Sequence, residues 1–121
     1  MIQTSNFNSI CLISNRKDVV KFCEQAVGSL AKIYTENEFS SSIIRFSNFV
    51  LLDSSMVQSE ESFLFLKKNK DINKKVILLV PFNNSSKNEF FDFSFIKESI
   101  TVPSSFSLFR QKIEQLLVEK Q

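Results

Sequence analysis

The chain has 121 residues, the length of a single domain (residues 1–121), which can bury roughly two thirds of the surface of its unfolded state. Fifteen Lys and Arg against thirteen Asp and Glu give a net charge of +2, which excludes the strongly basic surface expected of a nucleic-acid-binding protein or of a protein that binds anionic membranes. Histidine is absent and glycine occurs once, so the sequence offers neither a His-based catalytic pair nor a glycine-rich phosphate loop. We therefore expect no enzymatic activity, no metal and no cofactor.

The longest apolar run, residues 76–82, is too short to cross a bilayer, and residues 1–6 lack the basic residue and apolar core of a signal peptide. These features predict a soluble, cytoplasmic protein. Cys11 and Cys23 lie inside apolar stretches, so we expect free thiols in the core and no disulfide.

The first half of the chain alternates apolar runs with segments of helical period. We predict a strand at residues 9–13, a helix capped by Asn15 at 16–30, a strand at 31–34 and a helix at 38–46. The second of these helices has the weaker pattern. Its predicted buried residues are Phe39, Ile43, Ile44 and Phe46.

In the second half, strands are predicted at residues 49–53, 76–80 and 99–102. A helix is expected at 56–69, and an apolar period of 3.6 after Pro103, with Ser104 or Ser105 as the cap, predicts a final helix at 106–118. The remaining segment, residues 87–96, is treated as an irregular helix and holds four crowded aromatic residues, Phe90, Phe91, Phe93 and Phe95.

Five alternations of strand and helix predict an α/β fold with helices on both faces of a parallel sheet. Residues 49–53 and 76–80 are apolar throughout, as in central strands buried on both faces. The first of these two strands ends on a carboxylate, Asp53, which marks the edge of the sheet as a place for chemistry or switching.

The chain resembles the receiver domain of bacterial two-component response regulators over its whole length. Asp53-Ser54-Ser55-Met56-Val57 matches the family pattern Asp-x-x-Met-Pro, and Thr101-Val102-Pro103-Ser104 lies where the family has Lys-Pro after an apolar residue. This resemblance implies a flavodoxin-like three-layer sandwich with strand order 2-1-3-4-5 and five helices, and it makes Asp53 the phosphoacceptor candidate.

Other functional positions of the family are replaced by residues that cannot perform the same role. The acids that hold Mg²⁺ match Ser14 and Asn15, and the family lysine matches Val102. The switching hydroxyl matches Pro81, or Val80 if the register shifts by one residue. One carboxylate with neutral neighbours is a poor Mg²⁺ site. We therefore interpret Asp53 chiefly as an edge acid that accepts hydrogen bonds from backbone N–H groups at a helix start.

The phenylalanine-rich segment is the candidate interaction face, because the resemblance implies docking or homodimerisation through the helix at 87–96, the strand at 99–102 and the last helix. Surplus aromatic side chains would anchor such an interface; alternatively, all four rings are buried. Phe90, Phe91, Phe93 and Phe95 are the residues concerned.

The sequence thus predicts a receiver-like signal-transduction module, a degenerate or pseudo-receiver, which acts through a protein partner without Mg²⁺-dependent phosphorylation. One alternative is a genuine response regulator receiver phosphorylated at Asp53. Another is a flavodoxin-fold carrier or small-molecule-binding protein, which a pocket lined by converging polar groups at the same edge would favour.

Overall fold

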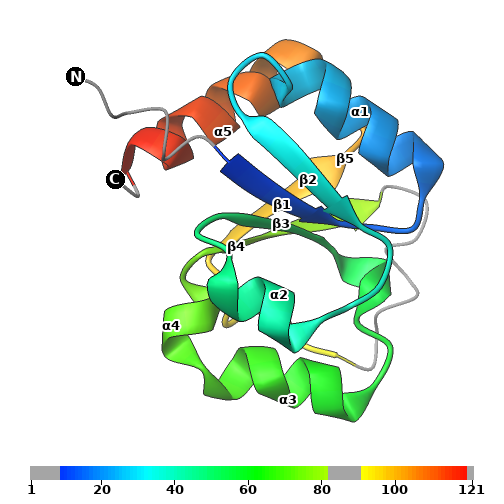
Figure 1. Ribbon diagram of the computed structural model, residues 1–121, viewed down its shortest axis with the longest axis vertical. Coiled ribbons are helices and arrows are strands. Elements are labelled where there is room, and N and C mark those ends of the chain that lie inside the picture. Colours follow the sequence, from blue (N-terminus) through cyan, green and yellow to red (C-terminus); the bar gives the residue numbers. More distant parts are fainter. Residues whose placement is uncertain (1–8, 82–90, 120–121) are drawn as a thin grey trace.

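The computed structural model describes residues 9–81 and 91–119 and contains one five-stranded sheet (Figure 1). The strands are β1 (Ser9–Ile13), β2 (Lys32–Glu36), β3 (Val50–Asp53), β4 (Val76–Pro81) and β5 (Glu98–Val102). All neighbouring strands are parallel, and their order is β2-β1-β3-β4-β5. This confirms the predicted flavodoxin-like topology, with β1 and β3 adjacent where the order of the strands reverses.

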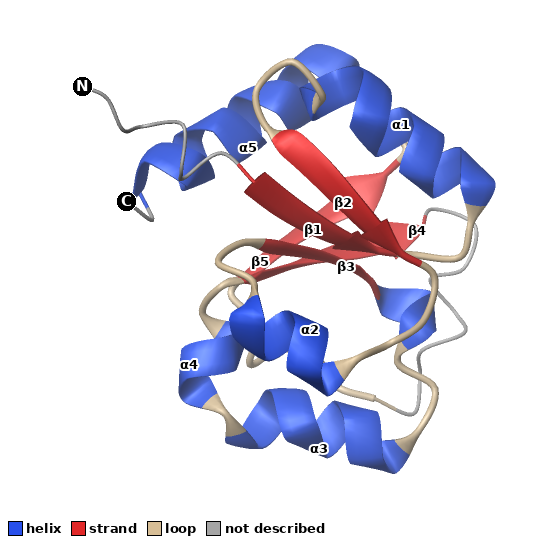
Figure 2. Cartoon of the chain, in the orientation of Figure 1, coloured by secondary structure: helices blue, strands red, loops and turns tan. Residues whose placement is uncertain are grey.

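Five α-helices complete the described part of the fold: α1 (Lys17–Val27), α2 (Ser41–Phe46), α3 (Glu60–Lys68), α4 (Lys70–Asn73) and α5 (Phe106–Glu119). Helices α1 and α5 cover one face of the sheet, and α2, α3 and α4 cover the other, so the fold has three layers (Figures 1 and 2).

Two apolar clusters fill the space between these layers. Because side chains alternate across a strand, Leu51 of β3 packs with α1 and α5, whereas Val50 and Leu52 pack in the cluster on the other face. Both faces of β3 are therefore buried, which explains why its sequence is continuously apolar.

Serine side chains cap three helices. Ser40 Oγ accepts from Ile43 N at 3.3 Å, Ser59 Oγ accepts from Ser62 N at 3.1 Å, and Ser105 Oγ accepts from Leu108 N at 3.3 Å. The last of these confirms one of the two predicted caps of α5. The predicted Asn15 cap is wrong: α1 begins after Arg16, and no side chain caps it.

The long helix predicted at residues 56–69 is divided. A short 3-10 helix at Ser54–Met56 precedes α3, and Asn69 separates α3 from α4. The side chain of Asn69 donates to Phe65 O at 2.7 Å. This bond satisfies a carbonyl in the last turn of α3, where the chain leaves the helical path.

The irregular helix predicted at residues 87–96 is not observed in the portion of that segment that the structure describes. Residues 91–97 form a non-helical connection, and Phe90 lies outside the described residues. Phe91, Phe93 and Phe95 are spaced two apart, which in an extended chain places all three rings on one side. Burial alternates along the segment in this way, but residues 94–95 form a turn in which Ile96 N–H donates to Phe93 O at 2.9 Å, so the segment is an irregular connection.

Phe46 is another correction. Its side chain was predicted to be buried, but it is 88% exposed at the end of the short helix α2, whereas Ile44 is fully buried and Phe39 and Ile43 are partly buried. Helix α2 has only six residues and starts later than predicted, so it offers fewer inward positions.

Both cysteines are free and buried, as predicted, on opposite faces of the sheet. Burial raises the pKa of the Cys23 thiol to about 12, with a further contribution from the charge of Asp53. Burial also raises the pKa of Cys11. Both thiols therefore stay protonated at neutral pH and are poor nucleophiles.

No helix among the described residues has the length and apolar character needed to cross a membrane.

Two phenylalanines provide a test of the core. Phe109 is 1% exposed and packs edge-on against Phe22, with 5.0 Å between ring centroids. We expect Phe109→Ala to lower the free energy of unfolding by about 3–5 kcal/mol in urea titrations. Phe46→Ala is the matched control and should change it by less than about 0.5 kcal/mol. Equal effects of the two substitutions would contradict the described packing of α5.

Candidate functional site

The carboxyl ends of β1, β3, β4 and β5 bring four sequence-predicted residues to one edge of the sheet. Leu12, Leu51 and Leu79 all face α1 and α5. By the alternation of side chains along a strand, the residues two positions further on face the same way. These residues are Ser14, Asp53 and Pro81, and Pro81 pairs with Val102 of β5.

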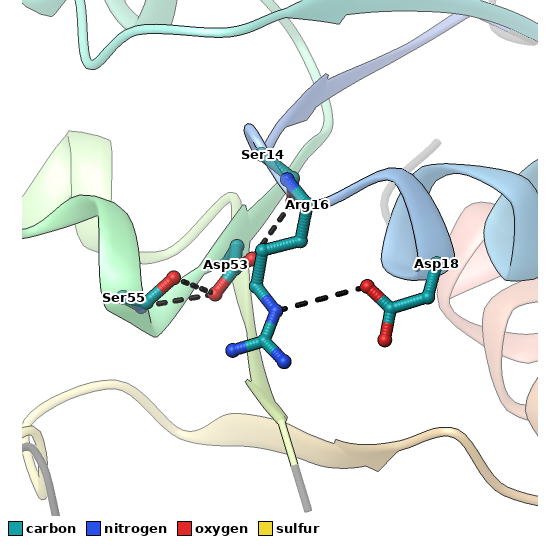
Figure 3. A network of polar contacts seen from close by, with 5 residues as sticks. All are labelled: Ser14, Arg16, Asp18, Asp53 and Ser55. Atoms are coloured by element: carbon teal, nitrogen blue, oxygen red, sulfur yellow. Dashed lines mark hydrogen bonds and ion pairs between the residues drawn. The ribbon is translucent and has the colours of Figure 1, made fainter. Parts of the chain in front are cut away.

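Asp53 is fully buried and accepts three hydrogen bonds from two serines (Figure 3). Ser14 Oγ donates to Oδ2 at 2.7 Å, while Ser55 donates to Oδ1 through its backbone N–H at 2.9 Å and through its Oγ at 2.7 Å. Hydrogen bonds of this length to a carboxylate offset the cost of removing it from water.

The bond from Ser55 N is the backbone hydrogen bond at a helix start that the sequence predicted for Asp53. Asp53 is the N-cap of the 3-10 helix that follows β3. Sequence reasoning missed the role of the Ser55 hydroxyl. The signal was present, because an Asp side chain often accepts from the backbone N–H two residues on, and here that residue is a serine, whose hydroxyl lies near the same oxygen.

Arg16 is a second residue whose place at this edge was not predicted. Its backbone N–H donates to Ser14 Oγ at 3.1 Å, and its Nε lies 3.8 Å from Asp18 Oδ1. In Figure 3 the Arg16 side chain passes in front of Asp53, and a dashed line joins its Nε to the carboxylate of Asp18. Ser14 therefore accepts from Arg16 and donates to Asp53, linking the β1 end to the β3 end.

The other predicted positions lie near Asp53 without completing a charged site. Val102 is 1% exposed and belongs to the apolar cluster with Phe109 and Ile113. Asn15 is exposed and lines a hollow in the surface beside the ends of the strands. Among the described residues, no group of three or more His, Cys, Asp or Glu side chains is placed to hold a metal ion.

The hollow beside Asn15 is lined mainly by polar residues that follow β1, β2 and β3, and it has a volume of about 490 Å³. It lies where the order of the strands reverses, the usual ligand position of open α/β sheets. Its lining comprises Asn15, Asn37, Glu38, Phe39, Met56, Gln58, Ser59 and Ser62.

The described phenylalanines of the candidate interaction face converge on one ring of α3. The centroid of Phe63 lies 4.9 Å from that of Phe91 and 5.6 Å from those of Phe93 and Phe95. All four rings are half-buried. They form what we call the Phe63 cluster (Phe63, Phe91, Phe93 and Phe95), which packs inward on one side and reaches solvent on the other.

No family model matches the sequence, and no curated protein matches it. Solved structures with the same fold do exist. The signal receiver domain of a protein assigned as a Luxo repressor from Vibrio parahaemolyticus has a TM-score of 0.66 at 14% identity, over 93% of this chain and 92% of that one. A response regulator receiver domain protein from Clostridium thermocellum has a TM-score of 0.65 at 15% identity, over 93% and 96%.

The fold is not restricted to proteins named as receivers. A protein assigned as pilus assembly-related from Burkholderia pseudomallei has a TM-score of 0.61 at 7% identity, over 98% of this chain and 95% of that one. At these identities the similarity establishes a receiver-like α/β fold, and the function has to be argued from the site.

The serine bonds to Asp53 can be tested by stability measurements. Ser14→Ala removes the donor to Oδ2 and should lower the free energy of unfolding by about 1–3 kcal/mol, because a buried acceptor loses its partner. Ser55→Ala should have a smaller effect, because its backbone N–H still donates to Oδ1. Urea denaturation provides the measurement.

Ser41→Ala is the matched control, since Ser41 is exposed on α2. It should shift the free energy of unfolding by no more than about 0.5 kcal/mol. If Ser14→Ala behaves like this control, the hydrogen bond to Asp53 does not contribute to stability.

Proposed function

We propose that this chain is a receiver-like signal-transduction module that works by binding a protein partner, without Mg²⁺-dependent phosphorylation and without catalysis. The observation that carries the proposal is the surroundings of Asp53. Its carboxylate is fully buried, and both oxygens accept hydrogen bonds from serines. This acid is held in place as a structural group at the edge of the sheet.

The donor set around Asp53 does not fit magnesium. Mg²⁺ requires near-octahedral oxygen ligands and is normally held by carboxylates together with phosphate oxygens and water. The neighbour of Asp53 directly after β1 is Ser14, whose hydroxyl donates to the carboxylate in the 2.7 Å bond. A metal ion would have to displace both serines, and the described surroundings supply no acid cluster to compensate.

The second family group that this chain replaces is the lysine that neutralises a transferred phosphoryl group. Phosphoryl transfer is catalysed mainly by positioning and by charge stabilisation on the equatorial oxygens. The family lysine corresponds to Val102, whose side chain is buried among the apolar residues of α5. Phosphorylation of Asp53 by the usual route should therefore be slow or absent.

A partner would bind at the face formed by the Phe63 cluster and β5. Half-exposed aromatic rings that are already fixed by mutual packing lose little conformational freedom on binding, which makes them good interface anchors. The homodimer expected through this face is less well supported, because residues 91–97 contain no helix. We therefore assign this face to a different protein.

One alternative, a genuine receiver phosphorylated at Asp53, is favoured by the position of this acid at the carboxyl end of β3. A BeF₃-activated DrrB receiver domain has the same fold, with a TM-score of 0.59 at 13% identity. The other, a small-molecule carrier, is favoured by the polar hollow beside Asn15.

Metal titration separates the proposal from the phosphorylated receiver. With Mg²⁺ and beryllofluoride, we expect the amide resonances of Ser54 and Ser55 to remain unchanged in ¹⁵N-correlated NMR spectra, because Asp53 lacks partners for the metal. A phosphorylatable receiver domain measured in parallel is the positive control. Saturable shifts that disappear in Asp53→Asn would replace the proposal with the phosphoacceptor alternative.

Partner binding can be tested with charged substitutions in the Phe63 cluster. Phe91→Arg and Phe95→Arg should each reduce recovery of the bound partner from the source organism about tenfold or more, as expected for interface anchors. Gln25→Arg, at an exposed position of α1, is the control for the introduced charge and should have no effect. Circular dichroism checks that each variant is folded.

The opposite pattern would reject this docking face. If recovery is unchanged by both cluster substitutions and is abolished by Asp53→Asn, the partner recognises the Asp53 site.

A further inference from the structure

Strand β2 has one open edge. Within residues 9–81 and 91–119, it is the first strand in the order of the sheet and pairs only with β1 (Figure 1). An open edge presents unpaired backbone N–H and C=O groups and is a template for pairing with another strand.

The backbone groups that face outward can be identified. Glu36 O accepts from Ser14 N at 3.0 Å, so the backbone of Glu36 points toward β1. Backbone groups alternate in direction along a strand, so Lys32 and Tyr34 also point toward β1. The outward groups are therefore those of Ile33 and Thr35.

The side chains of β2 on the α2 face carry opposite charges at the two ends of the strand. Lys32, Tyr34 and Glu36 share this face by alternation, and the Lys32 Nζ lies 5.3 Å from the centroid of the Tyr34 ring. Tyr34 stands at the middle of the five-residue strand, with a cation at one end and an anion at the other.

Exposed aromatic surface lies beside this edge. Tyr34 is 50% exposed and Phe46 is 88% exposed, and both line a cleft of about 390 Å³ between β2 and α2. Exposed aromatic residues around one cleft are typical of an interaction surface.

We propose that β2 pairs with β2 of a second copy of this chain, antiparallel and centred on Tyr34. In this register Lys32 of each copy lies opposite Glu36 of the other. Ile33 of each copy lies opposite Thr35 of the other, which matches the outward backbone groups and forms two hydrogen-bonded pairs. The Lys32–Glu36 and Tyr34–Tyr34 pairs are then non-hydrogen-bonded pairs, in which side chains approach most closely.

The charge pattern selects a second copy as the occupant. A two-fold axis places the same surface on both sides, so each residue must be complementary to its symmetric counterpart. Lys32 and Glu36 satisfy this condition twice in one dimer, and the pairing uses the full length of β2. The other edge strand, β5, is not complementary to itself in this way. The same two-fold operation about Ile100 places Glu98 opposite the apolar residue Val102.

The size of the interface predicts a concentration-dependent dimer. Stable protein interfaces bury at least about 1,000 Å², more than one short strand supplies. The exposed rings of Tyr34 and Phe46 and the adjoining cleft extend the contact beyond the backbone. We therefore expect a reversible equilibrium between monomer and dimer.

Charge reversal tests the register directly. Lys32→Glu alone or Glu36→Lys alone places like charges opposite each other twice, and each should weaken dimerisation at least about tenfold in sedimentation-equilibrium experiments. The double variant Lys32→Glu/Glu36→Lys restores both opposite-charge pairs and should recover the dimer. Lys68→Glu and Glu61→Lys, at exposed positions of α3, are the charge-matched controls.

Hydrogen exchange provides a second readout. The amides of Ile33 and Thr35 should become protected as protein concentration rises, while the exposed amide of Ser107 on α5 should not change. The proposal is overturned if the wild type remains monomeric at all concentrations, or if the double variant is as weak as the single variants. Neither measurement involves Asp53 or the Phe63 cluster, so failure here is distinct from failure of the proposed function.

Discussion

Burial of the three central strands on both faces is the constraint on which the rest of the structure depends. Strands β1, β3 and β4 have almost no exposed side chains, so each must alternate its residues between two separate apolar clusters. A shift of one residue in any of them would exchange the residues of the two clusters. The same register carries Ser14 and Asp53 to adjacent strand ends, where they can form a hydrogen bond.

This constraint explains why the sheet was predictable. The ends of all five strands agree with the predicted ranges to within two residues. A short, continuous apolar run such as Val76–Pro81 is typical of a strand that is buried on both faces of a parallel sheet. Helices α1 and α5 were predictable for a similar reason, since their buried residues recur with the helical period. Helix α2 was harder, because six residues are too few to establish a period.

The remaining differences come from contacts between distant parts of the chain. Residues 87–96 were expected to be helical, but Phe63 of α3 provides a surface on which Phe91, Phe93 and Phe95 all pack from a non-helical segment. At the site, the sequence identified Asp53 and the neutral residue Ser14 opposite it. It did not reveal that Arg16 N would donate to Ser14 Oγ, because that bond depends on how the chain turns from β1 into α1.

Under the proposed function, in which Asp53 is not phosphorylated, the burial of Val102 limits how this chain could be converted into a phosphorylatable one. This side chain is buried in the apolar cluster that holds Phe109 and Ile113, so a lysine there would have to fit a longer, charged side chain into that packing. A designer who wishes to engineer such activity would have to rebuild the packing of α5 first, and acids at positions 14 and 15 would not suffice. The apolar packing beneath the carboxyl ends of the strands thus restricts which charged side chains can be introduced there.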